Sequence, residues 1–306
     1  VVLMTYGSAT TAEHVRDYFD HIYPGKVSPE LVADFEDRYR LVGGSPLIRI
    51  TKEQAALLES KLGDGYVVKA GMRHSAPFIA DAVTDCIAEG AETIMGIILS
   101  PQFSSFIMEG YKKDFGTATQ ASGITNSTVT QPWPTEKHFI ELLVNRIQDK
   151  LDVLGPQTPV VFTTHSLPQS VVEKDPSYLK QLQKTIDAVR AKLSAKVEWY
   201  QAYQSAGHTP EEWLKPDLTD ILSDLAKAGH ATVLIVPIQF LADHLEIFYD
   251  LDMAARVQCE SVGIDYNRND LPNTDPLFID ALAELTEKEM QRSRRTGVAS
   301  RHNARE

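Results

Sequence analysis

Short apolar runs alternate along the chain with longer segments in which apolar residues recur at helical spacing. Residues 93–99 and 232–238 are continuous apolar runs, and residues 1–5 form a similar run that ends at small and polar residues. Runs of this length are typical of strands buried on both faces of a sheet. Four more strands are expected, at residues 66–70, 124–130, 160–164 and 197–203.

The segments between these runs predict helices. Ser28 followed by Pro29 is a helix start and Gly43 a helix stop, whereas Thr51 and Gln54 have the spacing of a capping box at the start of the next helix. Residues 117–122 are small and polar and are expected to form a loop. Helices are expected at residues 13–21, 29–42, 51–62, 77–89, 108–115, 135–153, 177–193, 217–228, 243–255 and 276–292.

This alternation predicts an α/β fold with parallel sheets and helices on both faces. Gly155 and Pro156 mark the best domain boundary, which gives an N-terminal α/β domain at residues 1–154 and a C-terminal α/β domain at residues 155–275. A final helix follows at residues 276–292. The tail at 293–306 is polar and aperiodic, and we expect it to be disordered.

Polar residues follow most of the predicted strands, at the edge where open α/β sheets bind ligands. His165 ends the run at 160–164, and Asp243 and Glu246 follow the run at 232–238, with Asp250 expected on the same helical face. An imidazole and a carboxylate in one crevice suit a first-row divalent ion. Two structural alternatives stay open, because a strand-end histidine often bonds a backbone carbonyl and acidic helix starts are often solvated.

Composition narrows the class of protein. The net charge is −12, and basic residues cluster only after Arg292, which argues against nucleic acid as a partner. The two cysteines, Cys86 and Cys259, supply neither a disulfide framework nor an iron–sulfur cluster, and they fit a reducing cytoplasm. No run of residues is apolar enough to cross a bilayer. We expect a soluble enzyme without a glycine-rich nucleotide motif.

Several blocks together resemble the ferrochelatase family, and most closely the coproporphyrin ferrochelatases of Gram-positive bacteria. They occur in family order over nearly the whole chain. The blocks are Met-Thr-Tyr-Gly-Ser at 4–8, Asp-Arg-Tyr at 37–39, Gly-Gly-Ser-Pro-Leu at 43–47, Pro-Gln-Phe-Ser at 101–104, His-Ser-Leu-Pro at 165–168, Tyr-Gln-Ser-Ala-Gly at 203–207 and Ala-Asp-His-Leu-Glu at 242–246.

The resemblance implies a chelatase-like fold of two doubly wound parallel-sheet domains with a porphyrin cleft between them. It implies insertion of ferrous iron as a substrate ion, with coproporphyrin III preferred, in haem biosynthesis and without a cofactor or iron–sulfur cluster. His165 and Glu246 are then the catalytic and metal-binding pair, and Tyr6 approaches the opposite face of the ring. The implied contacts to propionates and the ring edge are Arg38, Tyr39, Ser45 and Tyr111.

Three positions depart from the Gram-positive pattern. Tyr23 stands where that type has an arginine, Ala254 where a further glutamate is usual, and Gln102 where it has a histidine. A protoporphyrin IX ferrochelatase and a non-catalytic haem- or tetrapyrrole-binding protein therefore remain alternatives. A chelatase of another tetrapyrrole, such as a cobalt enzyme, is a further alternative, because a shared fold does not fix the metal. We expect a cytoplasmic monomer that contacts haem-pathway enzymes transiently.

Overall fold

The computed structural model describes residues 1–193, 197–207 and 210–303, with side chains through residue 293. Its first sheet contains β1 (Val2–Thr5), β2 (Lys69–Met72), β3 (Ile94–Ile98) and β4 (Ser127–Val129) in the spatial order β2-β1-β3-β4. The second contains β5 (Val160–His165), β6 (Trp199–Gln204), β7 (Thr232–Pro237) and β8 (Asp265–Arg268) in the equivalent order β6-β5-β7-β8. All neighbouring strands are parallel, so the prediction of two doubly wound sheets is confirmed.

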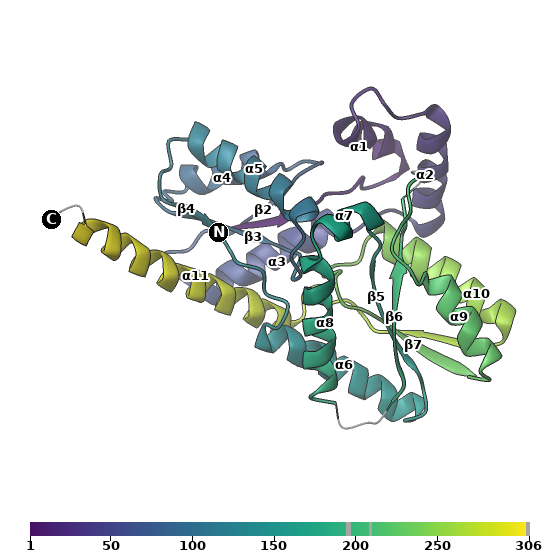
Figure 1. Cartoon of the computed structure of the whole chain (residues 1–306). Helices are drawn as coiled ribbons and strands as arrows, with labels where there is room; N and C mark the ends of the chain where they lie inside the picture. Colours follow the sequence, from purple (N-terminus) through teal and green to yellow (C-terminus); the bar gives the residue numbers. More distant parts are fainter. Residues whose placement is uncertain (194–196, 208–209, 304–306) are drawn as a thin grey trace.

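Helices connect the strands of each sheet and cover them (Figure 1). In the first half these are η1 (Ala12–His14), α1 (Val15–Ile22), α2 (Pro29–Val42), α3 (Leu47–Leu62), α4 (Ile79–Ala88), α5 (Ser105–Ala121) and α6 (Lys137–Leu154). In the second half they are α7 (Gln169–Lys174), α8 (Ser177–Arg190), α9 (Leu218–Lys227), the π-helix η2 (Ile247–Ala255), α10 (Arg256–Val262) and α11 (Pro276–Asn303).

Local signals in the sequence set several helix ends correctly. The Ser28 hydroxyl accepts a hydrogen bond from the Leu31 amide at 3.2 Å, and Gly43 ends α2 in the left-handed conformation with φ of 78°. The capping box at Thr51 is wrong, because α3 begins at Leu47 and the Thr51 hydroxyl donates to the Leu47 carbonyl inside the helix. Gln54 instead bonds to the carbonyl of Asn273 at 2.8 Å, in the other half of the chain.

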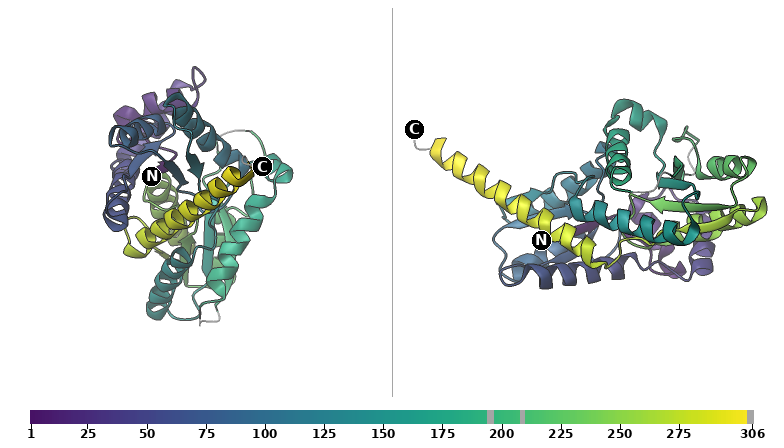
Figure 2. Two further views of the ribbon diagram at one scale, coloured as in Figure 1. Left: turned by 90° about the vertical axis from the view of Figure 1, so that its left-hand side faces the viewer. Right: turned by 90° about the horizontal axis from the view of Figure 1, so that it is seen from below.

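Other expectations were also wrong in detail. The strand expected at 66–70 lies at Lys69–Met72, and the expected loop at 117–122 is helical through Ala121. The sequence analysis did not find α7, α10 or β8, which are short and weakly patterned. Helix α11 runs to Asn303 and extends away from the body of the molecule (Figure 2), and the disorder expected at residues 293–306 stays a prediction. Residues 304–306 of that tail lie outside the described residues.

One apolar core joins the two sheets. It includes Leu3 and Ile97 from the first sheet and Phe162 and Val236 from the second, each at most 1% exposed. Burying a side chain of this size stabilises the fold by about 1.5–3 kcal/mol. α6 precedes the expected boundary at 154 yet packs against α8 and β7, while α11 packs against α3 and α6. The two halves are therefore interlocked by helices as well as by this core, and the division at 154 stays a prediction.

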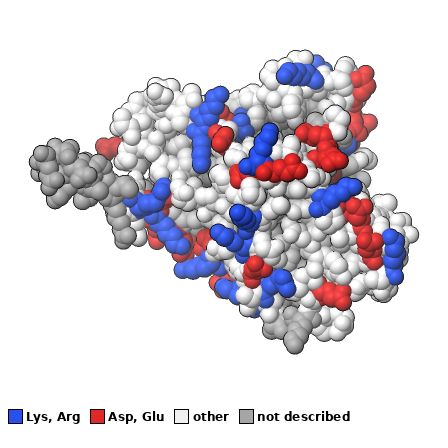
Figure 3. Space-filling model, in the orientation of Figure 1, with Lys and Arg blue, Asp and Glu red and all other residues white. Residues whose placement is uncertain are grey.

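The distribution of surface charge and the character of the helices were compared with the expectation of a protein that binds no nucleic acid and does not cross a membrane. On the face drawn in Figure 3, acidic and basic side chains of the described residues are interspersed and do not separate into regions of one sign. None of the helices in the described part of the chain has both the length and the apolar character needed to span a bilayer.

Candidate active site

His165 is the last residue of β5, at the carboxyl edge of the second sheet. Its amide donates to the Gln239 side chain at 3.0 Å, and its Nδ1 makes a short hydrogen bond to the Ser166 carbonyl. A carbonyl can only accept, so Nδ1 carries the proton and Nε2 has a free lone pair when the ring is neutral. The imidazole is thus held in the tautomer that accepts a proton or a metal ion through Nε2.

Glu246 lies opposite this imidazole, in the segment that follows β7, and directly precedes η2. Its Oε2 is 3.6 Å from Nε2 of His165 and 3.8 Å from Nε2 of His244. Burial acts to raise the pKa of Glu246, but attraction to His165 and His244 outweighs it and holds the pKa at about 2. The pKa of His244 is raised, because the Glu246 carboxylate outweighs the opposing effect of burial. The site therefore combines an ionised carboxylate with imidazole nitrogens.

The segment after β7 differs from the regular helix expected at 243–255. Helix η2 begins only at Ile247, and Asp243 lies before it, with its carboxylate accepting from the Asn273 amide at 2.7 Å. Asp243 is therefore not on the helical face of Asp250, and that expectation was wrong. Asp250 lies in the first turn of η2, which is a π-helix. This geometry is rare in proteins overall, but where it occurs it is often at a functional site.

Tyr6 directly follows β1 and is 42% exposed. Its ring lies 4.5 Å from the ring of His74, and Nδ1 of His74 lies 3.2 Å from Nδ1 of His21. Burial raises the pKa of Tyr6 to about 12, although the nearby Arg73 acts in the opposite direction. Burial and the nearby Arg73 lower the pKa of His74 to about 4, which keeps that ring neutral near pH 7.

The residues implied to contact propionates and the ring edge do not form one cluster. Arg38 is paired with Asp34 at 2.7 Å, and its guanidinium lies over the rings of Phe35 and Tyr249. The Tyr39 hydroxyl is hydrogen-bonded to that of Ser8 at 2.8 Å, and Tyr39 is buried. Tyr39 and one terminal nitrogen of Arg38 therefore already have protein partners, whereas Nε of Arg38 has no hydrogen-bond partner among the described residues.

Ser45 and Tyr111 are placed differently from each other. Ser45 lines an open cavity of about 790 Å³ together with Phe248 of η2, and its hydroxyl has no hydrogen-bond partner among the described residues. Tyr111 is buried in α5 beneath the guanidinium of Arg73, whose carbon lies 5.3 Å from the ring centroid. Ser45 thus offers a free hydroxyl, whereas Tyr111 supports Arg73.

Arg73 was missed by the sequence analysis, which ended the strand β2 too early. It directly follows β2 and donates to Asp114 of α5 at 2.8 Å. Its guanidinium packs on Gly110, where a Cβ atom would lie only 2.3 Å from it. Had the strand been predicted to end at Met72, Arg73 would have been identified as a cation at a strand end, next to His74.

The remaining flagged residues have ordinary surroundings. Cys86 and Cys259 are both fully buried and lie in the apolar core. Gln102 donates to the hydroxyl of Thr185 at 3.0 Å and so links the two halves. Tyr23 is half exposed and Ala254 is exposed, and neither side chain is charged near neutral pH.

Two doubly wound parallel-sheet units, with an imidazole at the end of β5 and a carboxylate immediately before η2, define a two-domain chelatase fold. Two solved structures have the same fold. SirB from Bacillus subtilis with Fe³⁺ aligns with a TM-score of 0.58 and 15% identity, over 80% of this chain and 91% of that one. CbiX, described as the terminal enzyme for biosynthesis of siroheme in denitrifying bacteria, aligns with a TM-score of 0.58 and 13% identity, over 94% of this chain and 97% of that one.

Sequence relatives specify the family. The ferrochelatase family model matches residues 1–290. Coproporphyrin III ferrochelatase of Halalkalibacterium halodurans is 35% identical over 95% of this chain and 96% of its own length. That of Bacillus subtilis is 34% identical over 95% of this chain and 98% of its own length. The chain belongs to the ferrochelatase family, as the sequence blocks predicted.

Proposed function

We propose that this protein is a lyase that inserts Fe²⁺ into a porphyrin, with coproporphyrin III preferred, in haem biosynthesis. The observation that carries the proposal is the separation of 3.6 Å between Nε2 of His165 and Oε2 of Glu246 at the carboxyl edge of the second sheet. Family membership over residues 1–290 supports the reaction class. The names of the bacterial relatives support coproporphyrin III as the substrate.

The chemistry needs a proton acceptor and a compensating charge at one place. Metallation removes two protons from pyrrole nitrogens and brings in a divalent ion. Nε2 of His165 can accept a proton because Nδ1 is engaged with the Ser166 carbonyl. Glu246 remains ionised with a pKa of about 2 and offsets the positive charge of the incoming iron. Both roles fit Fe²⁺ as a substrate, and the proposal requires no cofactor and no iron–sulfur cluster.

Tyr6 is proposed to face the ring from the opposite side. It follows β1, and its ring is 42% exposed, which leaves it accessible to a planar ligand. Arg38, Tyr39, Ser45 and Tyr111 are proposed to hold the propionates and the ring edge. Nε of Arg38 and the hydroxyl of Ser45 are buried and have no hydrogen-bond partner among the described residues, which supports a contact from each to a ligand. Tyr39 would have to share its bond to Ser8 with a ligand.

The wider proposal is a cytoplasmic monomer that makes transient contacts with haem-pathway enzymes and none with nucleic acid. Interspersed charges on the face in Figure 3 and a net charge of −12 support the last point.

An anaerobic metallation assay tests the function. Purified protein is mixed with Fe²⁺, or with Zn²⁺ as an oxygen-stable probe, and with coproporphyrin III or protoporphyrin IX. Catalytic turnover on coproporphyrin III with the higher kcat/KM supports the proposal. A higher kcat/KM on protoporphyrin IX would instead identify protoporphyrin IX as the preferred substrate. Tight binding without turnover would support a non-catalytic tetrapyrrole-binding protein, an alternative suggested by the uncharged residues Tyr23 and Ala254.

A further inference from the structure

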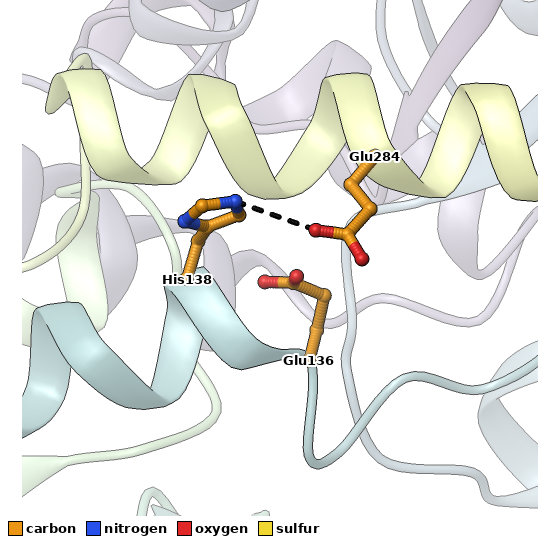
Figure 4. A group of neighbouring side chains, drawn as sticks. All are labelled: Glu136, His138 and Glu284. Atoms are coloured by element: carbon orange, nitrogen blue, oxygen red, sulfur yellow. Dashed lines mark ion pairs between the residues drawn. The ribbon is translucent and has the colours of Figure 1, made fainter.

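A second group of metal-ligating side chains lies away from the proposed active site, where α6 meets α11 (Figure 4). Glu136 is the residue that caps α6, His138 is in the first turn of that helix, and Glu284 comes from α11. Nε2 of His138 is 3.3 Å from Oε2 of Glu284. One ligand atom from each of the three residues lies within 4.8 Å of the other two.

Glu136, the residue that caps α6, is deeply buried, yet one of its carboxylate oxygens has no hydrogen-bond partner among the described residues. Glu136 is only 5% exposed. Its Oε2 accepts from the Phe139 amide at 2.8 Å, but its Oε1 has no hydrogen-bond partner among the described residues. A buried carboxylate oxygen without a partner is costly, so such an atom indicates a missing ligand. Figure 4 shows this carboxylate directed toward the side chains of His138 and Glu284.

We propose that Glu136, His138 and Glu284 bind a divalent first-row metal ion that joins the N-terminal end of α6 to α11. Two carboxylates and one imidazole are a donor set that Zn²⁺ and its neighbours accept, with a water molecule in the fourth position. Ligand atoms about 2.1 Å from an ion are at most about 4.2 Å apart, so side-chain shifts of under about 1 Å bring the three into range.

Two lysines compete with the ion for Glu284. Lys137 lies 2.9 Å from Oε2 and Lys288 lies 2.6 Å from Oε1 of that carboxylate. Both lysine side chains are more than 60% exposed and can turn into solvent at little cost. The ion must displace Lys137 from the oxygen that it shares with His138. If the three residues form a metal site, removing Lys137 should strengthen metal binding. If they form only an ion-pair network, removing Lys137 should not affect metal binding.

The test is a Zn²⁺ titration of the full-length, porphyrin-free protein by calorimetry, together with its melting temperature with and without Zn²⁺. Because the His165–Glu246 pair can also take Zn²⁺, the parent is compared with His165→Ala. Zn²⁺ should still bind to His165→Ala and raise its melting temperature. Adding His138→Ala should weaken the remaining binding by at least about 10-fold, since losing a ligand should cost no less than losing a supporting contact. Lys137→Ala should strengthen the binding.

His230→Ala is the matched control. His230 lies 3.4 Å from Glu198, a distance like that between His138 and Glu284, but no third metal-ligating side chain joins this pair among the described residues. Its loss should leave Zn²⁺ binding unchanged. Loss of all Zn²⁺ binding in His165→Ala, or unaltered binding after His138→Ala, would overturn the proposal. Glu284→Gln repeats the test if His138→Ala does not fold, and neither result bears on porphyrin metallation.

Discussion

The hydroxyl of Ser205 donates a short hydrogen bond to the Asp250 carboxylate, joining the loop after β6 to the first turn of η2. Ser205 has a positive φ of 56°, which is uncommon for a residue other than glycine. Burial and the nearby charge of Glu246 raise the pKa of Asp250 to about 6, although the Ser205 bond acts in the opposite direction. Asp250 is therefore the carboxyl group beside the proposed metal pair that titrates closest to neutral pH.

The raised pKa predicts a pH-dependent stability. The folded protein holds the Asp250 proton more tightly than the unfolded chain, so the free energy of unfolding should fall as the pH rises from about 4 to about 6. Asp250→Asn removes this pH dependence. As the pH rises across that range, the free energy of unfolding of the variant should therefore increase relative to that of the parent by up to about 2–3 kcal/mol. Denaturant unfolding of the metal-free proteins from pH 4 to 7 measures it. Parallel curves for the two proteins would contradict the assignment.

His165→Ala should abolish metallation without unfolding the protein. The change removes the proton acceptor and one side of the metal pair at once, and loss of a general base typically lowers the rate by about 100-fold or more. Initial rates with Zn²⁺ and coproporphyrin III measure the effect, and circular dichroism checks the fold. His230→Ala, which removes a histidine paired with Glu198 at 3.4 Å, serves as the control. Activity within a few-fold of the parent would refute the role of His165.

Replacing both cysteines should leave the chemistry intact. Cys86 and Cys259 are fully buried in separate apolar clusters. Cys86→Ala with Cys259→Ala should therefore keep the metallation rate within about 2-fold of the parent and cost about 0.5–3 kcal/mol of stability per site. Rate and thermal unfolding are measured on the same preparation. A folded double variant that no longer inserts metal would show that a thiol takes part.

Tyr6→Phe should weaken retention of the iron product more than it slows iron insertion. Tyr6 is 42% exposed, and its phenol can ligate or hydrogen-bond beneath the ring, whereas the proposed proton acceptor is His165 on the other side. Dissociation of iron coproporphyrin III, followed by transfer to an apo-haem protein, measures retention, and initial rates measure insertion. Tyr23→Phe, at a tyrosine that is 50% exposed, is the matched control. Equal losses in both measurements would contradict this role of Tyr6.

Much of the fold could be predicted because its signals are local. The buried strands β3, β5 and β7 are apolar enough to be recognised from composition alone, and Ser28 and Gly43 set the ends of α2. The short element α7 could not be found this way, since six residues carry no clear periodicity. The capping-box pattern at Thr51 failed because α3 already begins at Leu47, so Thr51 lies inside the helix and its hydroxyl bonds to the Leu47 carbonyl. Gln54 is then available to bond to Asn273.

The sequence by itself determined the alternation of strands and helices, the placement of His165 after a buried strand, and the family. These follow from residue types and order along the chain. Only the tertiary structure decided that His165 lies near Glu246, that Ser205 bonds to Asp250, and that Asp243 turns away toward Asn273. Such pairings depend on how strand ends and the π-helix meet in space, because contacts between side chains from separate elements leave no periodic pattern in the sequence.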